Sequence, residues 1–276
     1  MLFAVAGALV IGLSLGIFGS GGSILTIPVL VYLLGHDSKI AIAESLAIVG
    51  AIALIGSARF ARSKLVEWRM AFLFGLPGMV GTYLGAFLAS LVSGSLQLLV
   101  FGSIMLLASY MMWKRSKGGL AGAGEGSAPI PSRHFIKPMR DGAGVGVVTG
   151  FVGVGGGFLI VPALVILGGL TMRRAVGTSL IIISMNAAIG FVKYLQVLSD
   201  LGGQVDWATI GIFASVGIIG SLIGKSLNTR INQAALGRGF AVFLVVMALF
   251  VIIREAPSAF STPPTPAAQL QEGGSP

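Results

Sequence analysis

Cysteine is absent from the sequence, and charged residues are scarce, at 10% of 276 residues. Without cysteine the chain has no disulfide framework, no thiol nucleophile and no cysteine-based metal site. The sequence also has only two histidines, no HExxH motif and no pair of acidic residues at helical spacing. A membrane-embedded enzyme would need such convergent catalytic groups. We therefore expect no enzymatic activity, no bound metal ion and no cofactor.

Long hydrophobic stretches make up most of the chain. Hydrophobic residues account for 55% of it, and the mean hydropathy of +0.96 is too high for a soluble globular domain. A transmembrane helix needs about 20 apolar residues, and this criterion selects eight blocks: 2–34, 40–58, 70–92, 95–113, 142–168, 174–198, 207–227 and 234–253. The sequence therefore predicts an all-α polytopic membrane protein.

The net charge of +9 arises from 18 Lys and Arg residues that lie mainly in short segments between the apolar blocks. This distribution favours a role in membrane topology over nucleic-acid binding, so we expect lipid as a partner and no nucleic acid. Residues 114–140 are rich in Gly, Ser, Pro and basic residues and are predicted to link two halves of the chain. Residues 256–276 have a similar composition and are predicted to form a disordered tail.

The two halves of the sequence are copies of each other. The stretch GIFGSGGSILTIPVL at 16–30 matches GFVGVGGGFLIVPAL at 150–164 at an offset of 134 residues, and Ser45 falls opposite Ser179 at the same offset. Further along, VEWR at 66–69 meets VDWA at 205–208 at an offset of 139. Such a duplication of a four-block unit is typical of transporters built from repeats.

The positions of Lys and Arg distinguish two topologies for these repeats. If all eight blocks cross the membrane, the inside segments carry 12 of these residues and the outside segments carry 6. If the first and fifth blocks break at their glycines and return to the side they entered, the numbers become 15 and 3, which fits the positive-inside rule better. Three crossings in each half invert the second half relative to the first and place both termini outside.

The predicted fold is therefore two inverted-topology repeats, residues 1–113 and 141–255, joined by a cytoplasmic linker. Each repeat opens with a Gly-broken, re-entrant or discontinuous helix and continues with three spanning helices. Irregular backbone at membrane depth is tolerated only where it is buried in protein or lines a wet cavity. A broken helix presents free N–H groups and a positive dipole end there, which suits an anion.

The glycine-rich breaks are thus candidate sites for binding an anionic substrate near the membrane midplane. The candidate substrate-binding residues at the breaks are Gly19, Ser20, Gly21, Gly22, Ser23, Gly153, Gly155, Gly156 and Gly157. The alternative is that these glycines only allow close helix packing. We expect that packing role for Gly78, Gly81 and Gly85.

The two glycine-rich stretches and the segment RRAVGTSL at 173–180 resemble the sulfite exporter TauE/SafE family of membrane transporters. The resemblance covers nearly the whole chain outside the linker and the tail. It implies a secondary transporter that moves a small sulfur-containing or organic anion, such as sulfite, sulfoacetate or thiosulfate, across the bacterial inner membrane.

Polar residues inside the hydrophobic blocks are further candidates for the transport path, because each of them is expensive in hydrocarbon. Glu44 is the one carboxylate among them, and its counterpart in the second repeat is Thr178. Glu44 either binds a proton or a sodium ion that is coupled to anion movement, or forms an interfacial ion pair with Lys39. The residues Ser45, Thr178, Ser179 and Asn186 either line the path or make interhelical hydrogen bonds.

A channel for anions or small solutes is the alternative to a carrier. Paired broken helices with opposed amino ends also build channel pores. Exchange of labelled for unlabelled anion distinguishes the two, because only a carrier accelerates uptake against an excess of unlabelled substrate.

Overall fold

In a computed structural model, the described residues are 2–19, 21–117, 136–153, 157–200 and 202–260, and this part of the chain is helical without strands. Six of its helices are long and apolar enough to cross a membrane. They are α3 (Ser38–Arg62), α4 (Trp68–Ala89), α5 (Gly94–Lys117), α8 (Met172–Asp200), α9 (Trp207–Arg230) and α10 (Gln233–Phe260). The prediction of an all-α polytopic protein is confirmed.

The first and fifth hydrophobic blocks form pairs of shorter helices. The first block contains α1 (Leu2–Phe18), α2 (Gly21–Pro28) and the π-helix η1 (Val29–Leu33), and the fifth contains α6 (Ile136–Val152) and α7 (Gly157–Ile166). Gly19 and Gly153 follow α1 and α6 with φ angles of 74° and 75°. Glycine adopts positive φ without the steric penalty of a Cβ atom, so each first helix ends at its glycine.

Helices from the two halves of the chain pack against each other in matched pairs. α1 packs on α9 and α6 on α4, while α3 packs on α8 and α5 on α10. Glycines make the first two pairings close, because a Cβ atom on Gly81 or Gly85 would overlap backbone atoms of α6. Gly220 and Gly224 approach the backbone of α1 in the same way. The expected packing role of the α4 glycines therefore agrees with the structure.

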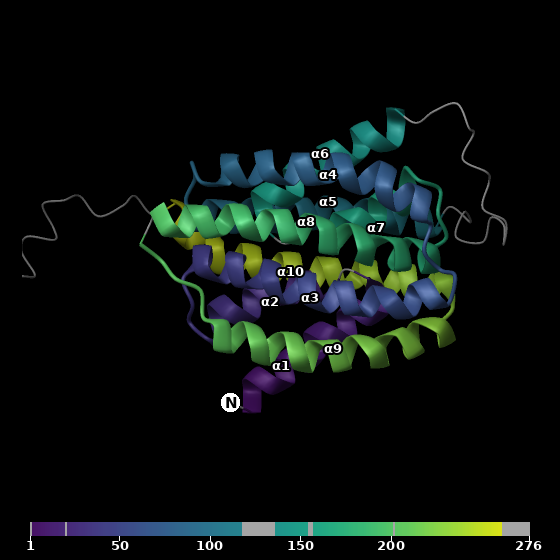
Figure 1. The fold of residues 1–276 in the computed structure, drawn as a ribbon, viewed down its shortest axis with the longest axis horizontal. Helices are drawn as coiled ribbons and strands as arrows, with labels where there is room; N and C mark the ends of the chain where they lie inside the picture. Colours follow the sequence, from purple (N-terminus) through teal and green to yellow (C-terminus); the bar gives the residue numbers. More distant parts are fainter. Residues whose placement is uncertain (1, 20, 118–135, 154–156, 201, 261–276) are drawn as a thin grey trace, which may run out of the picture.

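The long helices run between two ends of the molecule (Figure 1). The amino end of α3 contacts the segment before α9 through Glu44 and Asp206, and the amino end of α8 contacts the segment before α4 through Thr178 and Glu67. Each of these segments directly follows the carboxyl end of the other long helix, so α3 and α8 are antiparallel. We call the end with His36, Asp37 and Asp206 the His36 end, and the opposite end the basic end, which carries Arg59, Arg62, Lys64, Arg69, Arg173, Arg174, Lys225 and Arg230.

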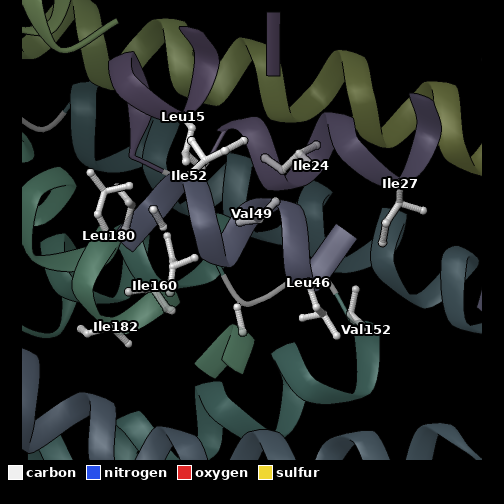
Figure 2. Close-up of a cluster of buried hydrophobic side chains, with 14 of the residues drawn as sticks. Leu15, Ile24, Ile27, Leu46, Val49, Ile52, Val152, Ile160, Leu180 and Ile182 are labelled. Carbon is white, nitrogen blue, oxygen red and sulfur yellow. The ribbon is translucent and has the colours of Figure 1, made fainter. Parts of the chain in front are cut away.

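The middle of the bundle is filled by apolar side chains. Figure 2 shows Leu15 of α1, Ile24 of α2, Val49 of α3, Ile160 of α7 and Leu180 of α8 directed toward a common centre. All of these side chains are at most 1% exposed. The core therefore joins both broken segments to the two long helices α3 and α8.

Helix extends into both segments that composition assigns to irregular structure. α5 continues to Lys117 and α6 begins at Ile136, inside the expected linker 114–140, and α10 continues to Phe260, past the expected start of the tail at Ala256. Average composition over a segment does not locate the last turn of a neighbouring helix. Residues 118–135 and 261–276 lie outside the described residues.

Candidate functional site

The amino ends of α2 and α7 follow the two glycine breaks, and these two helices contact each other. Gly21 and Gly157 are their first residues. The N–H groups in the first turn of a helix have no intrahelical partner, and the helix dipole adds partial positive charge there. Ser23, in the first turn of α2, is fully buried. Ser20, Gly155 and Gly156 lie outside the described residues.

Three of the predicted site glycines are in contact with neighbouring helices. A Cβ atom on Gly19 would lie 2.8 Å from the Val176 Cα atom of α8, and one on Gly153 would overlap Ile42 of α3. Gly22 faces α1, where a Cβ atom would overlap the Ile11 carbonyl oxygen. At these positions the absence of a side chain is required by packing.

Ser45 and Ser179 connect each break to a long helix. The Ser179 hydroxyl lies 3.3 Å from the Gly19 carbonyl oxygen, and the Ser45 hydroxyl lies 3.3 Å from the Gly153 carbonyl oxygen. Each hydroxyl also lies within 2.9 Å of a carbonyl oxygen one turn earlier in its own helix. Both serines are fully buried. Their protons are thus occupied by backbone carbonyls, while their oxygen lone pairs can still accept a hydrogen bond.

Two buried amides cap the carboxyl ends of the first broken helices. The Gln97 amide donates to the Val152 carbonyl oxygen of α6 at 3.2 Å and to the Tyr194 hydroxyl at 2.7 Å. The Asn228 amide donates to the Ile17 carbonyl oxygen of α1 at 2.6 Å. Neither residue is among the predicted site residues. The signal for Gln97 was its amide within the apolar block 95–113, since such groups need a partner.

Glu44 is fully buried, and both of its carboxylate oxygens have partners. Oε2 lies 2.7 Å from Nδ1 of His36, and Oε1 accepts the backbone N–H of Asp206 at 2.8 Å. The alternative of a Glu44–Lys39 ion pair is wrong. The Lys39 ammonium instead donates to the Ala89 carbonyl oxygen at 2.6 Å and to the Gln97 Oε1 atom at 3.0 Å.

Asp206 is the N-cap residue of α9 and lies beside the Glu44–His36 pair. Its carboxylate accepts hydrogen bonds from the Thr209 hydroxyl at 2.6 Å and from the Ala208 N–H at 2.9 Å. The hydrogen bonds from Thr209 and Ala208 stabilise the charged form and hold the pKa of the Asp206 carboxyl below its usual range. Asp206 therefore contributes a fixed negative charge at this end of the molecule at neutral pH.

The remaining two predicted polar residues differ in their partners. The buried Thr178 hydroxyl accepts the Glu67 backbone N–H at 2.9 Å. Asn186 is 1% exposed, and neither its Oδ1 nor its Nδ2 atom has a hydrogen-bond partner among the described residues. It faces Gly78 of α4, where a Cβ atom would lie 3.3 Å from either side-chain atom. Asn186 therefore has free hydrogen-bonding capacity in a buried position.

Comparison with known proteins identifies the family of this chain. The family model described as "Sulfite exporter TauE/SafE" matches residues 4–251. The chain belongs to the TauE/SafE family. A "Probable membrane transporter protein" from Xylella fastidiosa is 33% identical over 253 residues, which cover 88% of this chain and 92% of that protein. No solved structure has significant similarity to the chain.

More distant relatives carry the same description. The probable membrane transporter YunE of Bacillus subtilis is 27% identical over 81% of this chain and 87% of its own length. A probable membrane transporter of Methanocaldococcus jannaschii is 25% identical over 88% of this chain and 92% of its own length. Family membership and the six spanning helices make this TauE/SafE protein a multi-pass membrane transporter, which in bacteria resides in the inner membrane, and not an enzyme.

Proposed function

We propose that this TauE/SafE transporter is a secondary carrier for a small sulfur-containing or organic anion of the sulfite, sulfoacetate or thiosulfate type. The anion binds near the membrane midplane, between the amino ends of α2 and α7. The observation that carries this proposal is the contact between these two helices directly after the glycine breaks. Several neutral donors that converge on a charged ligand contribute about 1.5–3 kcal/mol each, which offsets the desolvation of a small anion.

We propose further that the two halves of the chain are inverted repeats and that the basic end faces the cytoplasm. Support comes from the equivalent hydrogen bonds in the two halves. Ser179 reaches Gly19 as Ser45 reaches Gly153, and Thr178 accepts from Glu67 as Glu44 accepts from Asp206. If a twofold axis in the membrane plane relates the two repeats, each contact in one half has an equivalent in the other half, and equivalent helices such as α3 and α8 are antiparallel.

A carrier explains the centre of the molecule better than a channel does. Buried apolar side chains from α1, α2, α3, α7 and α8 pack together around the breaks (Figure 2). Such packing is expected for an occluded state that opens to one side at a time. Glu44 is the proposed coupling residue, and it binds a proton during the transport cycle.

Ligand-dependent stability and counterflow test this function. The melting temperature of the detergent-purified protein is measured with sulfite, thiosulfate, sulfoacetate, sulfate and acetate, because a ligand that binds the folded state stabilises it by mass action. Labelled anion should then accumulate transiently in liposomes that are preloaded with unlabelled anion. Stabilisation without counterflow would indicate a channel or a sensor, and no stabilisation by any of these anions would contradict the proposed substrate class.

A further inference from the structure

At each end of the molecule a side chain of a long helix accepts a backbone N–H from the other half, but the accepting groups differ. At the basic end the Thr178 hydroxyl accepts the Glu67 N–H at 2.9 Å, and at the His36 end the Glu44 carboxylate accepts the Asp206 N–H at 2.8 Å. The neutral hydroxyl makes the same backbone contact as the carboxylate. A carboxylate is therefore not needed to hold the helices together, and burying one in this place is expensive.

His36 is the second difference between the two ends. The His36 N–H bonds to the Leu30 carbonyl oxygen at 3.1 Å, and the N–H of its counterpart Leu170 bonds to the Leu164 carbonyl oxygen at 3.1 Å. The backbone at the two positions is thus equivalent, while the side chains differ. The His36 side chain is 22% exposed and the Glu44 side chain is fully buried. The imidazole therefore lies between solvent at the His36 end and the buried carboxylate.

Several charged groups surround the segment that carries the imidazole. Among the described residues, the Asp206 carboxylate interacts electrostatically with His36. Asp37 and Lys39 lie on the same segment, but the Lys39 ammonium is held by Ala89 and Gln97. Arg254 of α10 lies over the Tyr32 ring of η1, 5.7 Å from its centroid. Two carboxylates, those of Glu44 and Asp206, thus lie near the imidazole.

We propose that His36 and Glu44 form a proton-loading pair at the His36 end, and that proton binding there weakens the contact between Glu44 and Asp206. The proposal rests on the coupling role of Glu44. A proton from water binds the imidazole at Nε2, and the Nδ1 proton moves along the 2.7 Å hydrogen bond to Glu44 Oε2. Histidine returns to its neutral form with the proton on Nε2, and Glu44 becomes a neutral carboxyl group.

Neutralising Glu44 changes how firmly α3 and α9 are joined. Hydrogen bonds to an ionised acceptor are roughly twice as strong as those to a neutral one, so the bond from the Asp206 N–H weakens on protonation. The equivalent bond to Thr178 at the basic end does not respond, because a hydroxyl does not titrate near neutral pH. A proton therefore loosens one end of the transporter and leaves the other unchanged.

A spectroscopic experiment tests the pair without any substrate. The sequence has two histidines, His36 and His134, so a His134→Gln protein labelled with ¹⁵N-histidine reports on the His36 imidazole alone. On acidification we expect the ring nitrogens to change from the neutral Nδ1–H form to the neutral Nε2–H form. In the additional variant Glu44→Gln, which has no carboxylate to take the proton, they should change to the imidazolium ion instead. Identical titration curves with and without Glu44 would overturn the proposal.

Transport provides the second measurement. Thiosulfate is a suitable probe because it remains a dianion between about pH 5 and about pH 8, the range in which histidines titrate. Uptake by parental protein in liposomes should change about tenfold across this range, and His36→Gln should reduce the change to about twofold or less. His134→Gln is the matched control and should keep the parental profile. An unchanged profile in His36→Gln would overturn the proposal. If parental protein transported none of thiosulfate, sulfite and sulfoacetate, the proposed anion function would be contradicted, while the titration experiment would still decide the proton-loading pair.

Discussion

At the scale of single residues, two buried amides show opposite relations to their surroundings. Gln97 has partners for both its donor and its acceptor atoms, while the Asn186 amide has none among the described residues. A buried polar group without a partner destabilises the folded state by about 1–3 kcal/mol. The amide of Asn186 is therefore retained at a cost to stability, which is expected of a residue that contacts substrate.

Replacing Asn186 and Gln97 by the aliphatic residues at the equivalent positions of the other repeat distinguishes a substrate-binding amide from a structural one. In the other repeat, Ile52 stands at the position of Asn186 and Leu236 at that of Gln97. We expect Asn186→Ile to raise the stability of the protein by about 1–2 kcal/mol and to reduce anion transport. Gln97→Leu should lower stability by about 1–3 kcal/mol, since it leaves Tyr194 and a helix carbonyl without their donor.

Unfolding in detergent and uptake in liposomes check this pair of variants. Both substitutions remove an amide and add apolar volume, so each is the control for the other. If Asn186→Ile were both destabilised and fully active, the amide would have a structural role and would not lie on the transport path.

At the scale of secondary-structure elements, the breaks after α1 and α6 depend on both conformation and space. Gly153 combines a φ of 75° with a position against Ile42 and Tyr194. An L-residue with positive φ is unfavourable by about 1–2 kcal/mol, and a Cβ atom would also overlap Ile42 of α3. The break is therefore set by the local backbone and by the neighbouring helix together.

Gly153→Ala should therefore destabilise the protein by about 2 kcal/mol or more. Gly144 is the control in the same helix, since a Cβ atom there would meet no atom within 4 Å apart from its own turn of helix. Gly144→Ala should stabilise the protein by about 0.5–1 kcal/mol, because alanine is the better helix former. The measurement is the free energy of unfolding in detergent. Equal effects of the two substitutions would show that the turn after α6 does not need glycine.

At the scale of the whole molecule, the two ends differ in charge. Of the 18 Lys and Arg residues in the sequence, only Lys39, Lys193 and Arg254 fall outside the segments that we assign to the cytoplasmic side. Lys193 projects from α8 over the Tyr83 and Phe87 rings of α4, at 5.3 and 5.5 Å from their centroids. The charge difference between the ends predicts a single orientation in the membrane.

Single cysteines test this orientation, because the chain contains none of its own. We expect an impermeant thiol reagent to label cysteines at Ser38 and Ser199 from outside the cell, and those at Ser63 and Ser127 only after the cell is opened. The first pair flanks the His36 end, and Ser63 lies at the basic end beside Lys225. Labelling at Ser199 from the cytoplasm, with Ser38 still external, would instead indicate eight simple spans and parallel repeats.

Locally encoded features of the fold follow from the amino-acid sequence alone. Hydrophobic length identified the membrane helices, and glycines at matched positions indicated where α1 and α6 end, since glycine adopts positive φ without a steric penalty. The repeat offset of 134 residues also pairs Glu44 with Thr178 and Ser45 with Ser179. Each of these results depends on residue type and spacing along one segment.

The partners of the buried polar groups, by contrast, depend on how distant helices pack. Glu44 accepts from Asp206, 162 residues away, and pairs with His36. Ser45 and Ser179 are bound to the breaks, and Asn186 is left without a partner among the described residues. A buried polar group takes its partner from the side chains and backbone that packing brings within about 3 Å. That choice is made by the meeting of distant helices, and no pattern within a single segment contains it.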